Sequence, residues 1–86
     1  MTNPNPVAPA SWSVVDGHSL RREFKFPDFA AALAFVNRVG ETAERQQHHP
    51  DIELGWGRAV ITTYTHTANG LTPKDYALAE AINGLI

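Results

Sequence analysis

The sequence predicts an α+β domain in which two helices pack on one face of a four-stranded antiparallel sheet. Two observations support this prediction: pairs of short β-favouring segments joined by turn residues, and two longer segments with apolar residues at helical spacing. The predicted order is strand, strand, helix, strand, strand, helix. Because each hairpin is followed by one helix, we expect a layer of helices on a layer of strands.

Size, charge and cysteine content exclude several classes of protein for this chain. The 86 residues suffice for one domain. The absence of cysteine excludes disulfides and thiolate ligands, and seven Lys and Arg residues without a run disfavour direct nucleic-acid binding. No stretch approaches the about 18 apolar residues of a membrane span. The first residues lack a signal-peptide pattern, so the expected location is the cytoplasm.

A proline-rich segment opens the chain, before the first predicted strand. Pro4, Pro6 and Pro9 block a helix, so residues 1–10 are expected to form a flexible arm. No linker or repeat divides the rest, which predicts a single domain over residues 11–86.

The first hairpin is predicted to join Ser11–Val15, centred on Trp12, to Leu20–Phe26. Asp16-Gly17 between them suits a tight turn. The second segment alternates apolar and charged side chains, as a half-buried strand does.

The long helix is expected to begin after Asp28, a helix-capping residue, and to run for roughly twenty residues. Gly40 weakens its middle by about 1 kcal/mol relative to Ala. It should end near His48, because Pro50 disfavours helical geometry at the residue before it. The predicted buried stripe consists of Phe29, Leu33, Val36, Val39 and Ala43.

The second hairpin is predicted to pair Ile52–Leu54 with Arg58–His66, which is rich in β-favouring residues. Gly55-Trp56-Gly57 forms the turn, with Trp56 expected in the core. Asn69-Gly70 makes a further turn before the last helix.

The last helix has a clear start signal. Thr72 is the expected N-cap, Pro73 the first helical residue, and Asp75 the third, which is a capping-box pattern. The predicted buried stripe is Leu78, Ile82 and Leu85.

Three histidines fall at the ends of predicted elements, where a small fold can gather polar side chains. His48 and His49 close the long helix, and His66 closes the long strand. Glu44 lies one helical turn before His48, so a shared face would let its carboxylate fix the tautomer of that imidazole. Such a pair suits general acid–base chemistry.

Each feature also has a simpler interpretation. A Glu/His pair is usually a solvated helix face, and histidines near a helix C-terminus complement its dipole. Three histidines could instead bind zinc, but the adjacent pair is awkward for joint chelation, so no metal site is predicted. His18 is expected to be exposed and without a role.

These residues together resemble the pterin-4a-carbinolamine dehydratase family. The resemblance covers the chain from Trp12 to the C-terminus. Its centre is Glu44-x-x-x-His48-His49-Pro50, followed by Thr65-His66, Gly70-Leu71-Thr72 and Asp75.

The resemblance implies dehydration of 4a-hydroxytetrahydropterin to quinonoid dihydropterin, which supports recycling of tetrahydrobiopterin and requires no metal or organic cofactor. It assigns acid–base catalysis to His48 and His66, with Glu44 orienting His48. His49 would bind the pterin, and Asp75 would have a supporting role in substrate binding. A homodimer or homotetramer is also implied.

Two departures from the family pattern stand out. The proline-rich arm takes the place of the usual N-terminal helix, and Thr67 stands where the family commonly has an acidic residue. The rival hypothesis is a non-catalytic scaffold that binds other proteins, either a transcriptional coactivator or a carboxysome-associated assembly factor.

Overall fold

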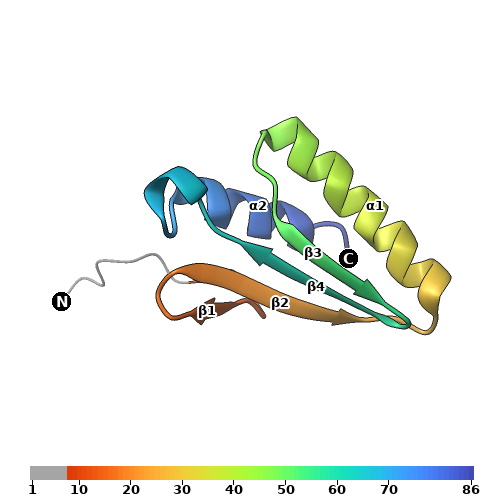
Figure 1. The fold of residues 1–86 in the computed structure, drawn as a ribbon. Helices are drawn as coiled ribbons and strands as arrows, with labels where there is room; N and C mark the ends of the chain where they lie inside the picture. The colour runs from red at the N-terminus through yellow and green to blue at the C-terminus, as the bar shows by residue number, and fades with distance from the viewer. Residues whose placement is uncertain (1–7) are drawn as a thin grey trace.

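The computed structural model describes residues 8–86, so most of the predicted arm, residues 1–7, lies outside the described residues. The described part forms an α+β sandwich, as predicted (Figure 1). Its elements are β1 Ser13–Val15, β2 Ser19–Lys25, α1 Phe29–Gln46, β3 Asp51–Gly55, β4 Arg58–Thr63, the 3₁₀ turn η1 His66–Ala68, and α2 Pro73–Asn83.

The sheet is antiparallel throughout, with strand order β1-β2-β4-β3. In the register, Phe24 of β2 lies opposite Ala59 of β4, and Ile52 of β3 lies opposite Ile61. Both helices lie on the same face of this sheet (Figure 1). The two central strands therefore present their inward side chains to the helices.

The core consists of inward side chains from the sheet and both helices. Leu20 and Phe24 of β2 are buried, whereas Arg21 and Glu23 between them are exposed, as the predicted alternation requires. The largest fully buried apolar side chains are Leu20, Ile61, Leu78, Ile82, Val39 and Val60.

The segment around Trp12 closes one end of the core. Its indole N–H donates to Asn83 Oδ1 at 2.8 Å, and its ring meets Phe24 edge-on. Pro9 is buried, and Asn83 donates a second hydrogen bond to the carbonyl oxygen of Ala10. Residues 8–10 are thus held against the end of α2.

Helix α1 buries only part of the predicted stripe: Val39 and Ala43 are buried as expected, but the other three members are not. Phe29 and Leu33 are 44% and 39% exposed, and Val36 is half-buried. The buried residues are Ala32, Phe35, Val39, Thr42 and Ala43. The helix carries two overlapping apolar stripes, and the Phe35 ring packs against the rings of Phe24 and Phe26 on the sheet side.

Two further predictions about local structure are wrong. Trp56 is not in the core but 75% exposed, in the turn between β3 and β4. Strand β4 ends at Thr63 instead of His66, since the chain turns there into η1. His66 therefore opens a turn and does not end a strand.

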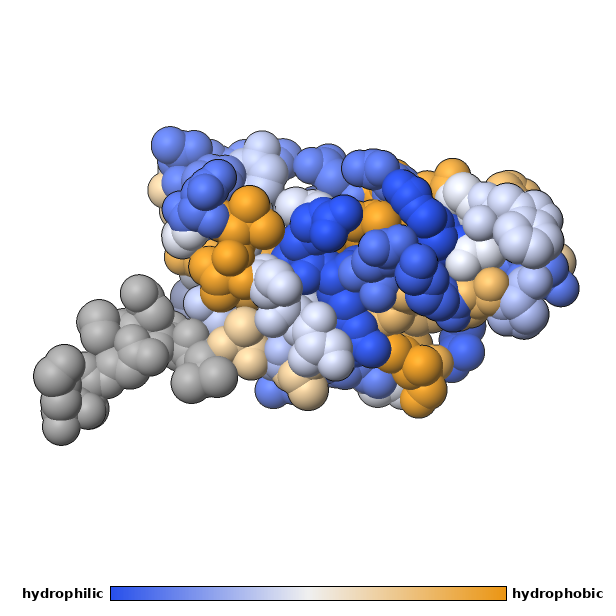
Figure 2. All heavy atoms as spheres, turned by 90° about the horizontal axis from the view of Figure 1, so that it is seen from below, coloured by the Kyte–Doolittle hydropathy of each residue, from blue (hydrophilic) through white to orange (hydrophobic). Residues whose placement is uncertain are grey.

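The sheet face without helices is largely hydrophilic along its centre (Figure 2). Charged residues of β2 and its neighbours lie there, and Lys25 Nζ is 3.4 Å from Glu23 Oε2. No helix among residues 8–86 is long and apolar enough to cross a membrane.

Candidate functional site

The end of α1 decides where the two adjacent histidines point. Gln47 adopts a left-handed conformation, with φ of 53°, so the helix ends before His48. The backbone N–H of His48 still donates to Ala43 O at 3.1 Å, which closes the helix end. Because the chain reverses here, the one-turn spacing between Glu44 and His48 no longer puts them on one face.

His48 is held by Asp75 of α2, not by Glu44. Its Nε2 lies 2.6 Å from Asp75 Oδ1, and the two side chains are 10% and 0% exposed. The expected pairing of Glu44 with His48 is therefore wrong. The sequence assigned Asp75 only a supporting role, whereas it is the partner of the most buried histidine of the site.

Asp75 is surrounded by hydrogen-bond donors. Its Oδ1 also accepts from the Thr63 hydroxyl at 2.7 Å, and Oδ2 accepts from the Thr65 hydroxyl at 2.8 Å and the Thr72 backbone N–H at 3.0 Å. Burial acts to raise the pKa of Asp75, but the hydrogen bonds from His48, Thr63, Thr72 and Thr65 outweigh it and hold this pKa below its usual value. Asp75 is thus an ionised acceptor.

An ionised Asp75 determines the tautomer of His48. A carboxylate only accepts hydrogen bonds, so Nε2 of His48 must carry the proton. In the neutral imidazole, Nδ1 is then left with a lone pair, and no residue of the described chain hydrogen-bonds to it. This nitrogen can take up or return a proton.

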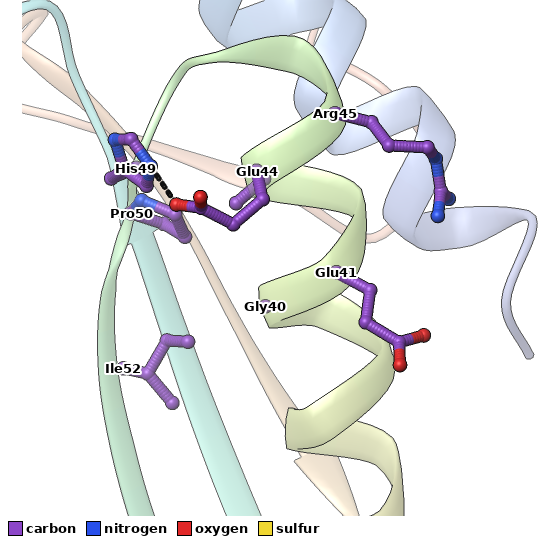
Figure 3. Close-up of a pocket in the computed structure, with 8 residues that line it drawn as sticks. Gly40, Glu41, Glu44, Arg45, His49, Pro50 and Ile52 are labelled. Atoms are coloured by element: carbon purple, nitrogen blue, oxygen red, sulfur yellow. Dashed lines mark hydrogen bonds and ion pairs between the residues drawn. The ribbon is translucent and has the colours of Figure 1, made fainter.

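Glu44 is instead paired with His49. Its Oε2 is paired with His49 Nε2, and Figure 3 shows the two side chains pointing toward each other across the end of α1. Both are well exposed, with side chains 71% and 59% accessible. The pair can orient His49 but is open to water.

His66 lies at the start of η1 and lines a cavity together with His48 and His49. It is exposed, and its ring packs against Tyr64 with centroids 4.4 Å apart. The structure thus brings His48, His49 and His66 together around one cavity of about 240 Å³. The cavity is lined by Gln47, His48, His49, Tyr64, Thr65, His66, Thr67 and Lys74.

A second, more open cavity of about 630 Å³ is also lined by His49. It runs between α1 and β3, where Ile52 and Pro50 face Gly40, while Glu41 and Arg45 extend outward (Figure 3). His49 lines both cavities. In the part of the chain that the structure describes, no three His, Asp or Glu side chains form a group that could hold a metal ion.

The sequence did not indicate Thr63, Tyr64 or Lys74 as residues of this site, and it gave Thr65 only as part of the family pattern, without a role. Thr63 and Thr65 support Asp75, and Thr63 is fully buried. The alternation of side chains along β4 could have indicated Thr63, because it continues the inward-facing series of Ala59 and Ile61. A hydroxyl buried in this way requires a polar partner. Tyr64 and Lys74 had no signal, since only the fold brings them to the cavity.

Comparison with known proteins identifies relatives along most of the chain. The family model described as pterin 4 alpha carbinolamine dehydratase matches residues 4–85. A protein of Rubrobacter xylanophilus with the provisional name pterin-4-alpha-carbinolamine dehydratase is 58% identical over 74 residues, which cover 86% of this chain and 69% of that one. One of Alkaliphilus metalliredigens with the same provisional name is 43% identical, covering 84% and 65%. The chain thus spans about two thirds of these relatives' length.

Two solved structures share the fold. A transcriptional coactivator/pterin dehydratase from Brucella melitensis superposes with a TM-score of 0.82 at 35% identity, covering 88% of this chain and 82% of that one. A pterin dehydratase-like protein described as a RuBisCO assembly factor in the alpha-carboxysome gives a TM-score of 0.73 at 25% identity, covering 87% and 88%.

Proposed function

Because this chain belongs to the pterin-4a-carbinolamine dehydratase family, we propose that it removes water from a 4a-hydroxytetrahydropterin at the cavity between His48 and His66. The reaction gives a quinonoid dihydropterin. The observation that carries the proposal is the buried His48–Asp75 pair facing a cavity that His66 also lines.

The chemistry needs two proton transfers. The 4a-hydroxyl leaves with an added proton as water, and the proton on N5 is removed as the C4a–N5 double bond forms. Two imidazoles on one cavity meet this need, since histidine exchanges protons near neutral pH. His48 and His66 are the proposed acid–base pair, with the direction of each transfer open.

The other residues of the site receive supporting roles in this proposal. Asp75 holds His48 as the Nε2–H tautomer, so that Nδ1 is the nitrogen that exchanges protons. His49 is proposed to bind the pterin, because it borders both cavities. Glu44 is proposed to orient His49, as their direct contact supports. The reaction as proposed uses no metal and no organic cofactor.

The test follows the decay of enzymatically generated 4a-carbinolamine with the wild type, His48→Ala and His66→Ala. The wild type should accelerate decay, and each variant should lose at least about 10²-fold in kcat, the usual contribution of an acid–base group. Trp56→Ala is the control, since its exposed indole lies in the turn before β4, whereas His66 follows the end of that strand. Wild-type decay at the buffer rate would refute the proposal.

The rival function is a non-catalytic role on the same scaffold. It is favoured by the similarity to the RuBisCO assembly factor, although that likeness is weaker than the match to the dehydratases. The same assay separates the two, because a binding scaffold would leave the carbinolamine decay unchanged.

We also propose that the chain self-associates as a homodimer or homotetramer. Phe29 and Leu33, one turn apart on α1, are large apolar side chains left exposed. Light scattering at micromolar concentration should give a mass above 9.4 kDa, and a monomer would contradict it. A cytoplasmic location, a role in tetrahydrobiopterin recycling and the lack of direct nucleic-acid binding stay predictions.

A further inference from the structure

Three aromatic rings connect the first hairpin to the turn that carries His66. The Tyr64 ring contacts the His18 imidazole at 4.5 Å between centroids and the His66 imidazole at 4.4 Å, with interplanar angles of 42° and 55°. His18 is the last residue of the β1–β2 turn, and Figure 1 shows this turn and η1 at the same end of the sheet. The sequence suggested that His18 is an exposed residue without a role. In the structure it is instead part of this three-ring group.

A hydrogen bond joins the same two segments. His18 Nε2 lies 3.3 Å from Asn69 Oδ1. Asn69 has a left-handed backbone, with φ of 52°, and its N–H donates to His66 O at 3.1 Å. The turn from His66 to Asn69 is closed further by the reciprocal backbone bonds of Thr65 with Gly70. His18 thus contacts the far end of the turn, while Tyr64 contacts its first residue.

His66 and His48 are held in different ways. His48 is nearly buried and bonded to Asp75, whereas His66 is exposed, and within residues 8–86 its side chain has no hydrogen-bond partner. An exposed imidazole without a partner samples several rotamers. Packing against Tyr64 is the contact that can restrict its ring, because tilted aromatic pairs at this separation attract one another.

We propose that Tyr64, backed by His18, is a positioning residue that holds the His66 imidazole in its working orientation. The inference rests on the proposed function, since it assigns His66 a proton transfer. Proton transfer depends on geometry within a fraction of an ångström, so loss of the ring should slow the chemical step. Binding of the pterin should change little, because Tyr64 acts through His66.

The test compares Tyr64→Ser, which removes the ring, with Tyr64→Phe, which keeps it. Tyr64→Ser should lower kcat by about tenfold and change KM by less than about twofold, while Tyr64→Phe should restore kcat to within about twofold of the wild type. His18→Ala, a milder change in a half-exposed loop residue, should lower kcat by about threefold. Trp56→Ser is the control for loss of an exposed aromatic side chain and should leave kcat unchanged.

A second readout does not depend on activity. The ring current of Tyr64 shifts the His66 Cε1–H proton resonance, so Tyr64→Ser should move this signal and increase the mobility of the amides from His66 to Asn69. Tyr64→Phe should preserve both. Circular dichroism and thermal unfolding establish that each variant is folded. If Tyr64→Ser does not fold, the kcat and the His66 resonance are measured in His18→Ala instead.

Three results would overturn the positioning role. The first is an unchanged kcat in folded Tyr64→Ser. The second is a raised KM with unchanged kcat, which would mean that the Tyr64 ring contacts the pterin directly. The third is an unchanged His66 resonance in Tyr64→Ser. An inactive wild type would refute the proposed function and with it the catalytic part of this inference. The resonance measurement would then still decide whether Tyr64 orders His66.

Discussion

His48 and Asp75 are 27 residues apart in the chain, yet His48 Nε2 lies 2.6 Å from Asp75 Oδ1 in the least accessible part of the site. One comes from the loop after α1 and the other from the first turn of α2. Asp75 also accepts the Thr72 backbone N–H, so a single carboxylate caps the helix and fixes the imidazole. The start of α2 and the proposed catalytic group are therefore one structural unit.

Asp75→Asn should impair both activity and stability. The carboxylate presents two acceptor oxygens to four donors, whereas the amide of Asn has a single acceptor oxygen. A buried donor is therefore left without an acceptor, at a cost of about 1–3 kcal/mol in unfolding free energy. An amide N–H facing Nε2 would also favour the other tautomer of His48, and kcat should fall by about 10²-fold. Urea unfolding and the carbinolamine assay measure the two effects. Asp51→Asn, an exposed carboxylate on β3, is the matched control, and equal effects of both variants would contradict the prediction.

Acid should destabilise the fold through Asp75. Its pKa is lower in the folded protein than the about 3.9 of an unfolded chain, so folding favours the ionised form. The resulting stability is fully present above that unfolded value and is lost as pH falls through the lower folded pKa. Unfolding free energies measured from about pH 6 downward should therefore decline below about pH 4.

The Asp75→Asn variant provides the control for this acid effect. It has no titrating group at position 75, so its unfolding free energy should fall less steeply below about pH 4. If the unfolding free energies of the wild type and Asp75→Asn fall equally below about pH 4, the decline comes from other carboxylates.

Glu44→Gln should affect substrate binding more than catalysis. Glu44 contacts His49, not His48, and both side chains of the pair are exposed. The expected result is a KM raised about threefold with kcat within about twofold of the wild type. Glu41→Gln is the matched control, because Glu41 lies on the same helix and lines the same cavity but points away from His49 (Figure 3). A loss of kcat as large as that of His48→Ala would mean that Glu44 acts on His48 after all.

Gly40→Ala should stabilise the protein. Gly40 lies inside α1 without a left-handed backbone, and a Cβ there would meet no atom within 4 Å. The free energy of unfolding should rise by about 0.5–1 kcal/mol, the helix-propensity difference between the two residues. Gly57→Ala makes the contrast, since its φ is +71° and a Cβ would lie 3.0 Å from Phe26 O, so this variant should be less stable than the wild type. Destabilisation by Gly40→Ala would show that the adjoining cavity does not tolerate the methyl group.

Local patterns in the sequence were sufficient for the order and kind of the elements. Asp28 caps α1 as predicted, with its side chain accepting from the Ala31 N–H, and Thr72-Pro73 starts α2. These signals act within one or two turns of chain, so the sequence displays them directly. The buried face of α1 did not follow in the same way. Its residues satisfy two helical stripes, and only packing of Phe35 against the sheet selected one of them.

The sequence by itself was sufficient to predict the three histidines of the proposed site, but not every residue around them. His48, His49 and His66 were identified from their spacing and from the resemblance to one family, and the fold gathers them around one cavity. The tertiary structure decided how they are held. The left-handed Gln47 turns His48 away from Glu44, and the packing of α2 on β4 brings Asp75 to it. Such partners depend on contacts between distant segments, which no local pattern of residues records.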